Sequence, residues 1–509
     1  MIRNVRHRYI FFSSIVLVFI LFTTYYLRDD IATATASSPI LENINAQLHP
    51  KNGPPPPPET QEEKRKRLKY KLPRPPTSYP IVDNFPLAAA LLSSSALPPI
   101  PEWNRPPSPH VPESTPLFIG FTRNWRILQQ VVVSYITAGW PPSDIYVIEN
   151  TGVMESNKHG RLSLQNPFFL NHTRLHMLGV NVIITPTLLT FAQLQNFYLW
   201  TSIQHDWDHY FWSHMDVVTV SFEDQYADRH AEAQTKILPP SDPKHDYSDF
   251  KSVYKMCVEA MRNITSPHPN TGKVLRWGQY FFSYDRLALV NVAAFVDVGG
   301  WDTLIPFYMT DCDMHARLDM HKYVIPESFP GMVFDVGSSM DDIIVLYRQK
   351  GTVAPSFNDP NFIEDELRQI AEGEKQAEDA GLTRRDTAPK VEMTGEAWEK
   401  EFTARSTSPK TWADDEIRSQ SFDDMIKVLD TMQHSKWANA RGRNTWQARQ
   451  TGGQGDPFYR DSVGFDIGIQ MTIEHGRAVF REKWGHRDCD IVDMGLMPDD
   501  AWRVEHDWD

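Results

Sequence analysis

The segment Asp297–Leu318 reads DVGGWDTLIPFYMTDCDMHARL. Three of its carboxylates lie within a span of twelve residues. They are Asp302, Asp311 and Asp313, and a strip of apolar residues lies between the first and the second. Burying a carboxylate beside apolar sequence is costly unless it is paired, hydrogen-bonded or bound to a metal. Such carboxylates are therefore candidates for chemistry. In the structural alternative, Asp302 or Asp311 is the N-cap of a helix that includes Met314–Met320.

A histidine and a further carboxylate lie in the apolar segment Tyr210–Val220, which reads YFWSHMDVVTV. His214 and Asp216 are two residues apart, so on a strand they project from the same face. Imidazole and carboxylate together suit Mn²⁺, and nucleotide sites hold Mn²⁺ or Mg²⁺ with one or two carboxylates and substrate phosphates. A structural pair, with His214 hydrogen-bonded to Asp216 or to backbone, is the alternative. His486 is a third candidate metal ligand or phosphate contact, or else a loop residue.

Elements around these residues alternate between the strand and helix patterns. Strand, helix and strand in this order indicate a parallel crossover, and their repetition predicts a mixed, mostly parallel α/β sheet with helices on both faces. The predicted strands are Leu117–Phe121, Asp144–Ile148, Leu178–Thr185 and Tyr210–Val220, and the predicted helices between them are Arg126–Ala138 and Phe191–Gln204.

Polar groups follow three of these strands at or near the carboxyl end. They form the segments Thr122–Asn124, Glu149–Thr151 and His214–Asp216. Ligands of open α/β sheets bind in the crevice outside the carboxyl ends of the strands. The sequence therefore predicts one site at this edge, with Asp216 and Asp311 facing the same crevice.

The order of these motifs over roughly residues 117–325 resembles the GT-A glycosyltransferases, and most closely the inverting family-2-type members. The segments Asn166–Gly179 and Thr185–Trp200 also resemble fungal type II membrane glycosyltransferases. The matching blocks are Thr122-Arg123-Asn124, Glu149-Asn150-Thr151, His214-Met215-Asp216, Gly299-Gly300-Trp301-Asp302, Thr310-Asp311-Cys312-Asp313 and Arg317-Leu318.

The resemblance implies roles for the residues in these blocks. Asp311 is the general base that deprotonates an acceptor hydroxyl, and Asp313 positions or tunes it. Trp301 and Asp302 line the acceptor side. Asp216, with His214 and His486 as further candidates, holds a metal ion (Mn²⁺ or Mg²⁺) that stabilises the leaving diphosphate. The donor-binding residues are Thr122, Arg123, Asn124, Glu149, Asn150 and Asp216.

Three positions depart from the pattern of that family. His214 stands where the family has the first Asp of its D-x-D motif, which puts metal dependence in question. Thr310 stands where an acidic residue precedes the base, and Thr303 replaces a Glu.

The N-terminal part of the chain predicts a membrane anchor and a stem. Residues 1–8 form a basic tail, and residues 9–27 are 19 uncharged residues, or roughly 28 Å of helix, enough to cross the bilayer core. A cleaved signal peptide is the alternative. Residues 28–114 include the run Pro54–Pro58 and predict a largely disordered stem. This topology places the rest of the chain in the lumen of the Golgi or the endoplasmic reticulum.

Residues 115–350 are predicted to form the catalytic domain and residues 351–509 an acidic, mostly helical extension. Three helices are expected there, Asn361–Ala380, Ser421–Trp437 and Ile467–Trp484. The formal net charge of −14 argues against nucleic-acid binding, which needs basic surface. Three cysteines, Cys257, Cys312 and Cys489, allow at most one disulfide and one free thiol.

These observations favour a single-pass type II glycosyltransferase that moves a sugar from a nucleotide sugar to a glycan or other hydroxyl acceptor. It could act in a complex with other glycosyltransferases. The alternative is a non-catalytic lumenal glycan-binding or scaffolding protein that keeps the fold. A glycoside hydrolase also uses paired carboxylates, but it does not need nucleotide-type loops at strand ends.

Overall fold

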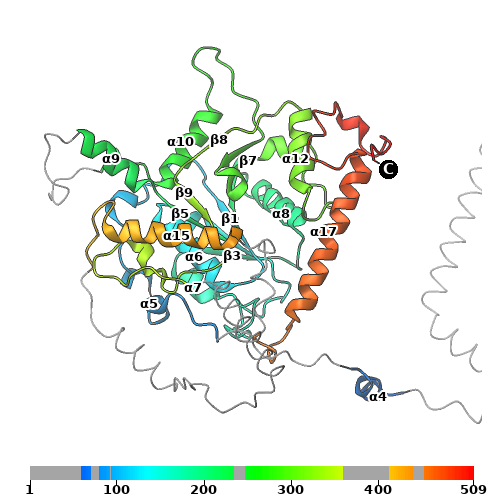
Figure 1. Cartoon of the computed structure of the whole chain (residues 1–509), viewed down its shortest axis with the longest axis horizontal. Helices are drawn as coiled ribbons and strands as arrows, with labels where there is room; N and C mark the ends of the chain where they lie inside the picture. The colour runs from blue at the N-terminus through cyan, green and yellow to red at the C-terminus, as the bar shows by residue number, and fades with distance from the viewer. Residues whose placement is uncertain are drawn as a thin grey trace, which may run out of the picture. The chain divides into compact units, whose positions relative to one another are not determined.

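The computed structural model describes residues 59–69, 80–91, 93–233, 247–358, 412–438 and 452–508 (Figure 1). The chain divides into two compact units, residues 1–72 and 73–509. The described part of the first unit contains the exposed helix α4 (Gln61–Lys66), which Thr60 and Glu63 close with a capping box. The predicted anchor at residues 9–27 lies outside the described residues. Among the helices that are described, none combines the length and the apolar character that a membrane span requires.

A seven-stranded sheet forms the centre of the second unit, in the order β3-β2-β1-β4-β7-β6-β8. The strands β3, β2, β1 and β4 run parallel to one another, and β6 is parallel to β8. Only β7 runs antiparallel to its neighbours β4 and β6. The prediction of a mixed, mostly parallel sheet is thus confirmed. The bounds are β1 Leu117–Phe121, β2 Ile145–Glu149, β3 Asn181–Ile184, β4 His209–Ser213, β6 Gln279–Phe282, β7 Leu287–Asn291 and β8 Glu327–Ser328.

Helices cover both faces of this sheet because successive strand residues point to opposite sides. Leu117 and Ile119 of β1 pack in one buried cluster with the helices α6, α7 and α10. Phe118 points the other way and stacks on Tyr198, with 4.9 Å between the ring centroids, among α8, α11 and α12. The bounds are α6 Trp125–Thr137, α7 His172–Met177, α10 Val253–Thr265, α8 Phe191–Gln204, α11 Val292–Asp297 and α12 Thr310–Met320.

The predicted fourth strand, Tyr210–Val220, is in fact two strands in two sheets. The chain leaves the main sheet after β4, and β5 (Val217–Val220) pairs antiparallel with β9 (Met332–Asp335) in a separate two-stranded sheet. The backbone N–H of His214 donates to the carbonyl of Arg286 at 3.1 Å. The single-strand prediction was wrong because apolar residues on both sides of Ser213–Asp216 gave the two strands the pattern of one. His214 and Asp216 lie at that change.

Residues 80–114 belong to the folded body, although their proline content predicted a disordered stem. Phe85 is fully buried, Trp103 is 2% exposed, and α5 (Pro86–Ala89) begins with a proline in its first turn. Asp83 forms an ion pair with Arg174 of α7 at 3.2 Å. Proline excludes long regular elements, but it does not prevent a short segment from packing its aromatic side chains.

Two long helices of the C-terminal part pack on this body. Helix α15 (Gln420–Ala438) matches the prediction of Ser421–Trp437, and α17 (Ser462–Trp484) begins five residues before the predicted start at Ile467. Figure 1 shows α17 beside α12. The predicted helix Asn361–Ala380 lies outside the described residues. The remaining elements are α9 (Glu223–Ala233) and the short 3-10 helices Ser94–Ala96, Glu102–Asn104, Pro142–Asp144, η4 (Tyr284–Arg286), Ile343–Tyr347 and Pro498–Asp500.

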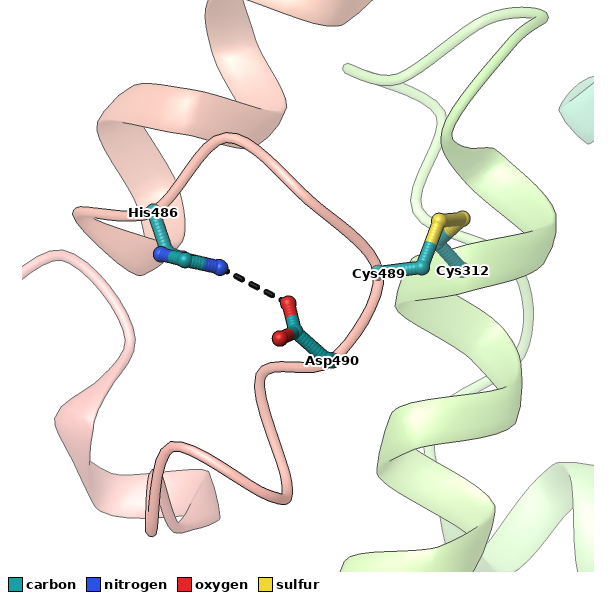
Figure 2. Close-up of a disulfide and its surroundings, with 4 residues drawn as sticks. All are labelled: Cys312, His486, Cys489 and Asp490. Carbon is teal, nitrogen blue, oxygen red and sulfur yellow. Dashed lines mark hydrogen bonds and ion pairs between the residues drawn. A yellow bond between two sulfur atoms is a disulfide. The ribbon is translucent and has the colours of Figure 1, made fainter.

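A disulfide joins Cys312 of α12 to Cys489 in the loop after α17 (Figure 2). The bridge spans 177 residues of sequence. Cys257 is a buried free thiol. This arrangement reaches the limit of one bridge and one free thiol that the cysteine count allowed.

Gly120 in β1 provides a test of how closely α8 packs on the sheet. A Cβ at this position would lie 2.8 Å from Leu194 Cδ2 and would also overlap the hydroxyl of Tyr198. We expect Gly120→Ala to lower the free energy of unfolding by about 1–3 kcal/mol, because overpacking displaces well-packed neighbours.

The matched control is Gly468→Ala in α17, where nothing lies within 4 Å of the added Cβ. This variant should be neutral or more stable by about 0.5–1 kcal/mol, since glycine disfavours a helix. Urea denaturation followed by circular dichroism measures both. Equal stability of the two variants would contradict the packing of α8 on β1.

Candidate functional site

Asp216 lies at the start of β5, where a lysine of α15 reaches it. Lys436 Nζ donates to Asp216 Oδ2 at 2.8 Å and also binds Asp335 Oδ1 at the end of β9. Burial disfavours the charged carboxylate, but the ammonium of Lys436 and the imidazole of His214 outweigh it and lower the pKa of Asp216. Asp216 is therefore an ionised carboxylate with a counter-charge from the chain itself.

His214 lies between two carboxylates. Its Nδ1 is 3.7 Å from Asp216 Oδ1, and its Nε2 is 3.6 Å from Asp285 Oδ2. Burial opposes protonation of His214, but Asp285 and Asp216 raise its pKa above the ordinary value. Asp285 belongs to η4, the turn between β6 and β7, where Ser283 and Tyr284 both have left-handed backbone angles. Such angles in non-glycine residues are strained and cluster at functional sites.

Asp311 and His315 continue this arrangement on α12. They are four residues apart and so share one helix face. Burial lowers the pKa of His315, while the charges of Asp311 and Asp285 act in the opposite direction. His214 is in contact with Asp216 and Asp285, and His315 interacts electrostatically with Asp285 and Asp311. We call these five residues, Asp216, His214, Asp285, His315 and Asp311, the Asp–His row. The row connects the end of β4, the turn η4 and the first turns of α12.

The N-cap of α12 is Met309, in a left-handed conformation and without a capping side chain. Neither Asp311 nor Asp302 is therefore the cap. Asp311 lies in the first turn of the helix and is half-buried, and its carboxylate makes no hydrogen bond with any residue that the structure describes. A carboxylate in the first turn is favoured by the positive end of the helix dipole.

Asp313 is fully buried and its two oxygens are occupied. Arg317 Nε donates to Oδ2 at 2.9 Å, whereas Trp484 Nε1 donates to Oδ1 at 3.0 Å. Lys483 Nζ lies 2.6 Å from Oδ1 and also donates to Asp302 Oδ2 at 2.7 Å. Burial alone would raise the pKa of Asp302, but Lys483 lowers it. These contacts fasten α12 to α17, which is a positioning role.

Trp301 is also part of the packed interior. Its side chain is 3% exposed and lies against Phe191 and Phe295, with ring centroids 5.6 and 5.9 Å away. Its backbone exchanges two hydrogen bonds with the Asn196 side chain, both of 2.8 Å. Gly299 and Gly300 precede it with left-handed angles, as the predicted turn requires. The indole ring therefore supports the turn and does not present a face to solvent.

Two predicted donor residues at the end of β2 hold neighbouring loops. The buried carboxylate of Glu149 accepts from Asn157 Nδ2 at 2.8 Å and lies 2.6 Å from His172 Nε2. Asn150 donates to the carbonyl of Leu189 at 2.9 Å and accepts from its N–H at 2.7 Å. Both side chains are committed to partners within the chain.

Arg123 lies at the end of β1 and is a buried cation whose N–H groups are not used in hydrogen bonds within the described part of the chain. It is 4% exposed and stacks on Phe465 of α17 at 4.8 Å. Burial lowers its pKa to about 10, against a weak opposing effect of Asp466. Thr122 beside it is half-buried, and Asn124 N-caps α6 through the N–H of Ile127.

A second arginine from the C-terminal part reaches the same edge of the sheet. Arg460 donates to the carbonyls of Thr151 and Gly152, at 2.6 and 3.1 Å. Its guanidinium also lies over the ring of Phe168, 4.7 Å from the centroid. The loops after β1 and β2 are therefore closed by side chains that come from residues 460–465.

The proposed metal ligands do not come together as a metal site. His486 Nε2 is 2.8 Å from Asp490 Oδ1 (Figure 2), and its Nδ1 bonds to Asp507. Asp216 is bound to Lys436, and His214 faces Asp285. Over the described ranges, no cluster of three or more His, Cys, Asp or Glu side chains could hold a metal ion. The residues present therefore do not fit the Mn²⁺ or Mg²⁺ that the resemblance implied.

Sequence reasoning missed the residues that come from distant segments. Lys436 is 220 positions from Asp216, and Lys483 is 181 positions from Asp302. Asp285 and His315 lie closer to the motifs but match none of them. His315 could have been found from its spacing of four from Asp311, which places both on one helix face. Neither lysine has such a signal.

Comparisons with known proteins give distant structural likenesses only. No protein-family model and no curated protein sequence matches the chain. A cytidylyltransferase from Leptospira borgpetersenii serovar Hardjo-bovis (strain JB197) aligns at 10% identity with a TM-score of 0.24, over 43% of this chain and 76% of its own. A mannosyltransferase from Pyrobaculum calidifontis, solved with GDP-Man and Mn²⁺, aligns at 11% identity and a TM-score of 0.24, over 45% of this chain and 58% of its own. These TM-scores are too low to establish a shared fold, so the function must be argued from this chain's own residues.

The contacts of Asp313 predict a large effect on stability. Asp313→Asn removes the counter-charge of Arg317 and one partner of Lys483 inside the protein. We expect a loss of about 3–5 kcal/mol in the free energy of unfolding, the usual cost of leaving a buried charge unpaired. Asp319→Asn, an exposed position on the same helix, should change stability by less than about 0.5 kcal/mol. Chemical denaturation of both variants measures this; equal stability would remove the structural role of Asp313.

The surroundings of His486 predict a dependence of stability on pH. The hydrogen bond to Asp507 and, after the opposing effect of burial, the bond to Asp490 raise the pKa of His486 above 6.5. Its stabilising effect is therefore fully present below pH 6.5 and is lost as the pH rises through the pKa of the folded state. We expect His486→Gln to destabilise the protein more at pH 5.5 than at pH 8.5, by thermal denaturation. A larger loss at pH 8.5 would be inconsistent with the ion pairs.

Proposed function

We propose that this protein is a glycosyltransferase that transfers a sugar from a nucleotide-sugar donor to a hydroxyl of a glycan or similar acceptor. The observation that carries the proposal is the Asp–His row. It connects Asp216, in the position where the resemblance expects the donor, with Asp311, in the position where it expects the base. The two residues are ninety-five positions apart in sequence.

Asp311 is the member of the row suited to act as general base. It is half-buried, and no described side chain occupies its oxygens. In the proposed reaction its carboxylate takes the proton of the acceptor hydroxyl as the oxygen attacks the anomeric carbon. The bond from that carbon to the diphosphate breaks as the new one forms, with inversion. His315 lies one turn further along α12, on the same helix face as Asp311.

Arg123 supports a donor site at the carboxyl ends of β1 and β2. A buried guanidinium without a hydrogen-bonded partner is costly, and an anionic or polar ligand would relieve that cost. Because Glu149 and Asn150 are committed to Asn157, His172 and Leu189, we assign the nucleoside contact to Arg123 and Thr122 first.

The cellular setting remains the one that the sequence predicts, as part of the proposal. Residues 9–27 anchor the chain as a type II membrane protein of the Golgi or the endoplasmic reticulum. The folded body is lumenal, and a complex with other glycosyltransferases is compatible with this placement. The family-2-like and fungal character of the resemblance belongs to the same proposal.

The second candidate is a non-catalytic glycan-binding or scaffolding protein. The internal hydrogen bonds of Glu149 and Asn150 favour it, because both are residues that a donor nucleotide would be expected to contact. A scaffold need not bind a nucleotide sugar. Calorimetric titration of the purified chain with UDP- and GDP-sugars therefore separates the two candidates.

The test of the catalytic proposal is a screen of nucleotide sugars for transfer or hydrolysis, with wild type and Asp311→Asn. We expect turnover to fall by about 10²–10⁴-fold in the variant, the usual contribution of a general base. Asp319→Asn on the exposed side of α12 should keep wild-type turnover. If Asp311→Asn keeps both its melting temperature and its turnover, Asp311 is not the base.

A further inference from the structure

We propose that the ammonium of Lys436 is the resident cation between Asp216 and Asp335, in the position that a divalent metal ion would take. Helix α15 thereby supplies from the chain itself the positive charge at this end of the site. On the function proposed above, on which the identity of the ligand depends, the diphosphate of a nucleotide sugar binds here without a divalent metal.

Lys436 forms buried ion pairs and not a pair on the protein surface. Its side chain is 7% exposed, and those of Asp216 and Asp335 are 11% and 14% exposed. The stem of Lys436 packs beside Gly337, where an added Cβ would lie at van der Waals distance, 3.4 Å, from Lys436 Cγ. Gln433, one turn earlier on α15, accepts from the N–H of Asp335 at 2.9 Å. The helix is thus fixed to β9 beside the lysine.

The ammonium has one N–H to offer a ligand. A lysine has three donors, and two of those of Lys436 go to Asp216 Oδ2 and Asp335 Oδ1. The third has no partner among the residues that the structure describes. Burial would lower the pKa of Lys436, but the two carboxylates raise it, so the amine remains charged. A phosphate oxygen is the anionic acceptor that suits this remaining donor.

The same geometry explains why a divalent ion is excluded. A metal ion at this place would use the two carboxylates as its protein ligands and take phosphate or water oxygens for the rest. One oxygen of each carboxylate is already bound to the ammonium of Lys436, which lies between them. A metal ion must therefore displace a buried ammonium, which would be left without a counter-charge. Removing the ammonium should convert the position into a metal site.

The first experiment is calorimetric titration of the full chain with UDP and GDP, in EDTA and in Mn²⁺. We expect the wild-type affinity for the preferred nucleotide to differ by less than about 3-fold between the two conditions, since Lys436 already supplies the cation. Lys436→Gln should bind about 10- to 100-fold more weakly in EDTA, the size of one charge-assisted hydrogen bond, and Mn²⁺ should restore the affinity. Lys436→Arg should stay independent of metal. Lys427→Gln, an exposed lysine of α15 with a 69% exposed side chain, should equal wild type.

Wild-type binding that falls by an order of magnitude or more in EDTA would overturn the proposal. So would unchanged binding by a folded Lys436→Gln variant. If the wild type binds neither nucleotide in either condition, the proposed glycosyltransferase function fails, and the cation assignment is then tested without nucleotide.

The second experiment follows Mn²⁺ binding by electron paramagnetic resonance with no nucleotide present. In the wild type we expect no Mn²⁺ site that depends on Asp216, so Asp216→Asn should leave the signal unchanged. In Lys436→Gln we expect one new Mn²⁺ site, which should be absent from the double variant Lys436→Gln/Asp216→Asn. A wild-type Mn²⁺ site that depends on Asp216 overturns the assignment. A Lys436→Gln variant with a wild-type melting temperature and no Mn²⁺ site also overturns it. The wild-type measurement stands even if that variant fails to fold.

Discussion

Buried carboxylates need counter-charges, and in this protein two lysines of the C-terminal part supply them. Lys436 of α15 forms ion pairs with Asp216 and Asp335, and Lys483 of α17 forms one with Asp313. An ionised carboxylate without such a partner would be expensive to bury. The sheet and its loops place the acids, and the two helices that pack on the body bring the lysines to them. The C-terminal part is therefore a structural component of the site.

This dependence explains how α12 is held. Lys483 and Trp484 fix the helix through Asp313, and the bond between Cys312 and Cys489 fixes the adjacent turn. Asp311 immediately precedes these attachments and is next in sequence to the bridged cysteine. Its position is thus set by its neighbours, while its own carboxylate has no described hydrogen-bond partner. A base needs this combination of a fixed backbone and an available oxygen.

Local patterns predicted the elements well, and distant contacts decided the rest. The bounds of β1 and α8 agree with the sequence prediction, because alternating and helical apolar patterns report directly on burial. The break between β4 and β5 was missed because both strands are apolar. The motif blocks located Asp216 and Asp311, but no local pattern shows that Lys436 forms an ion pair with Asp216. Such pairs depend on tertiary packing across 220 residues of sequence.

In this mechanism Asp216 and Asp311 contact the same ligand. A crystal structure of the full chain with bound UDP or GDP would show whether they do. We expect the diphosphate at the third N–H of Lys436, with its terminal phosphate directed along the Asp–His row towards Asp311. A diphosphate bound elsewhere on the molecule, with Asp216, Lys436 and Asp311 left in their ligand-free contacts, would show that the two carboxylates do not share a ligand.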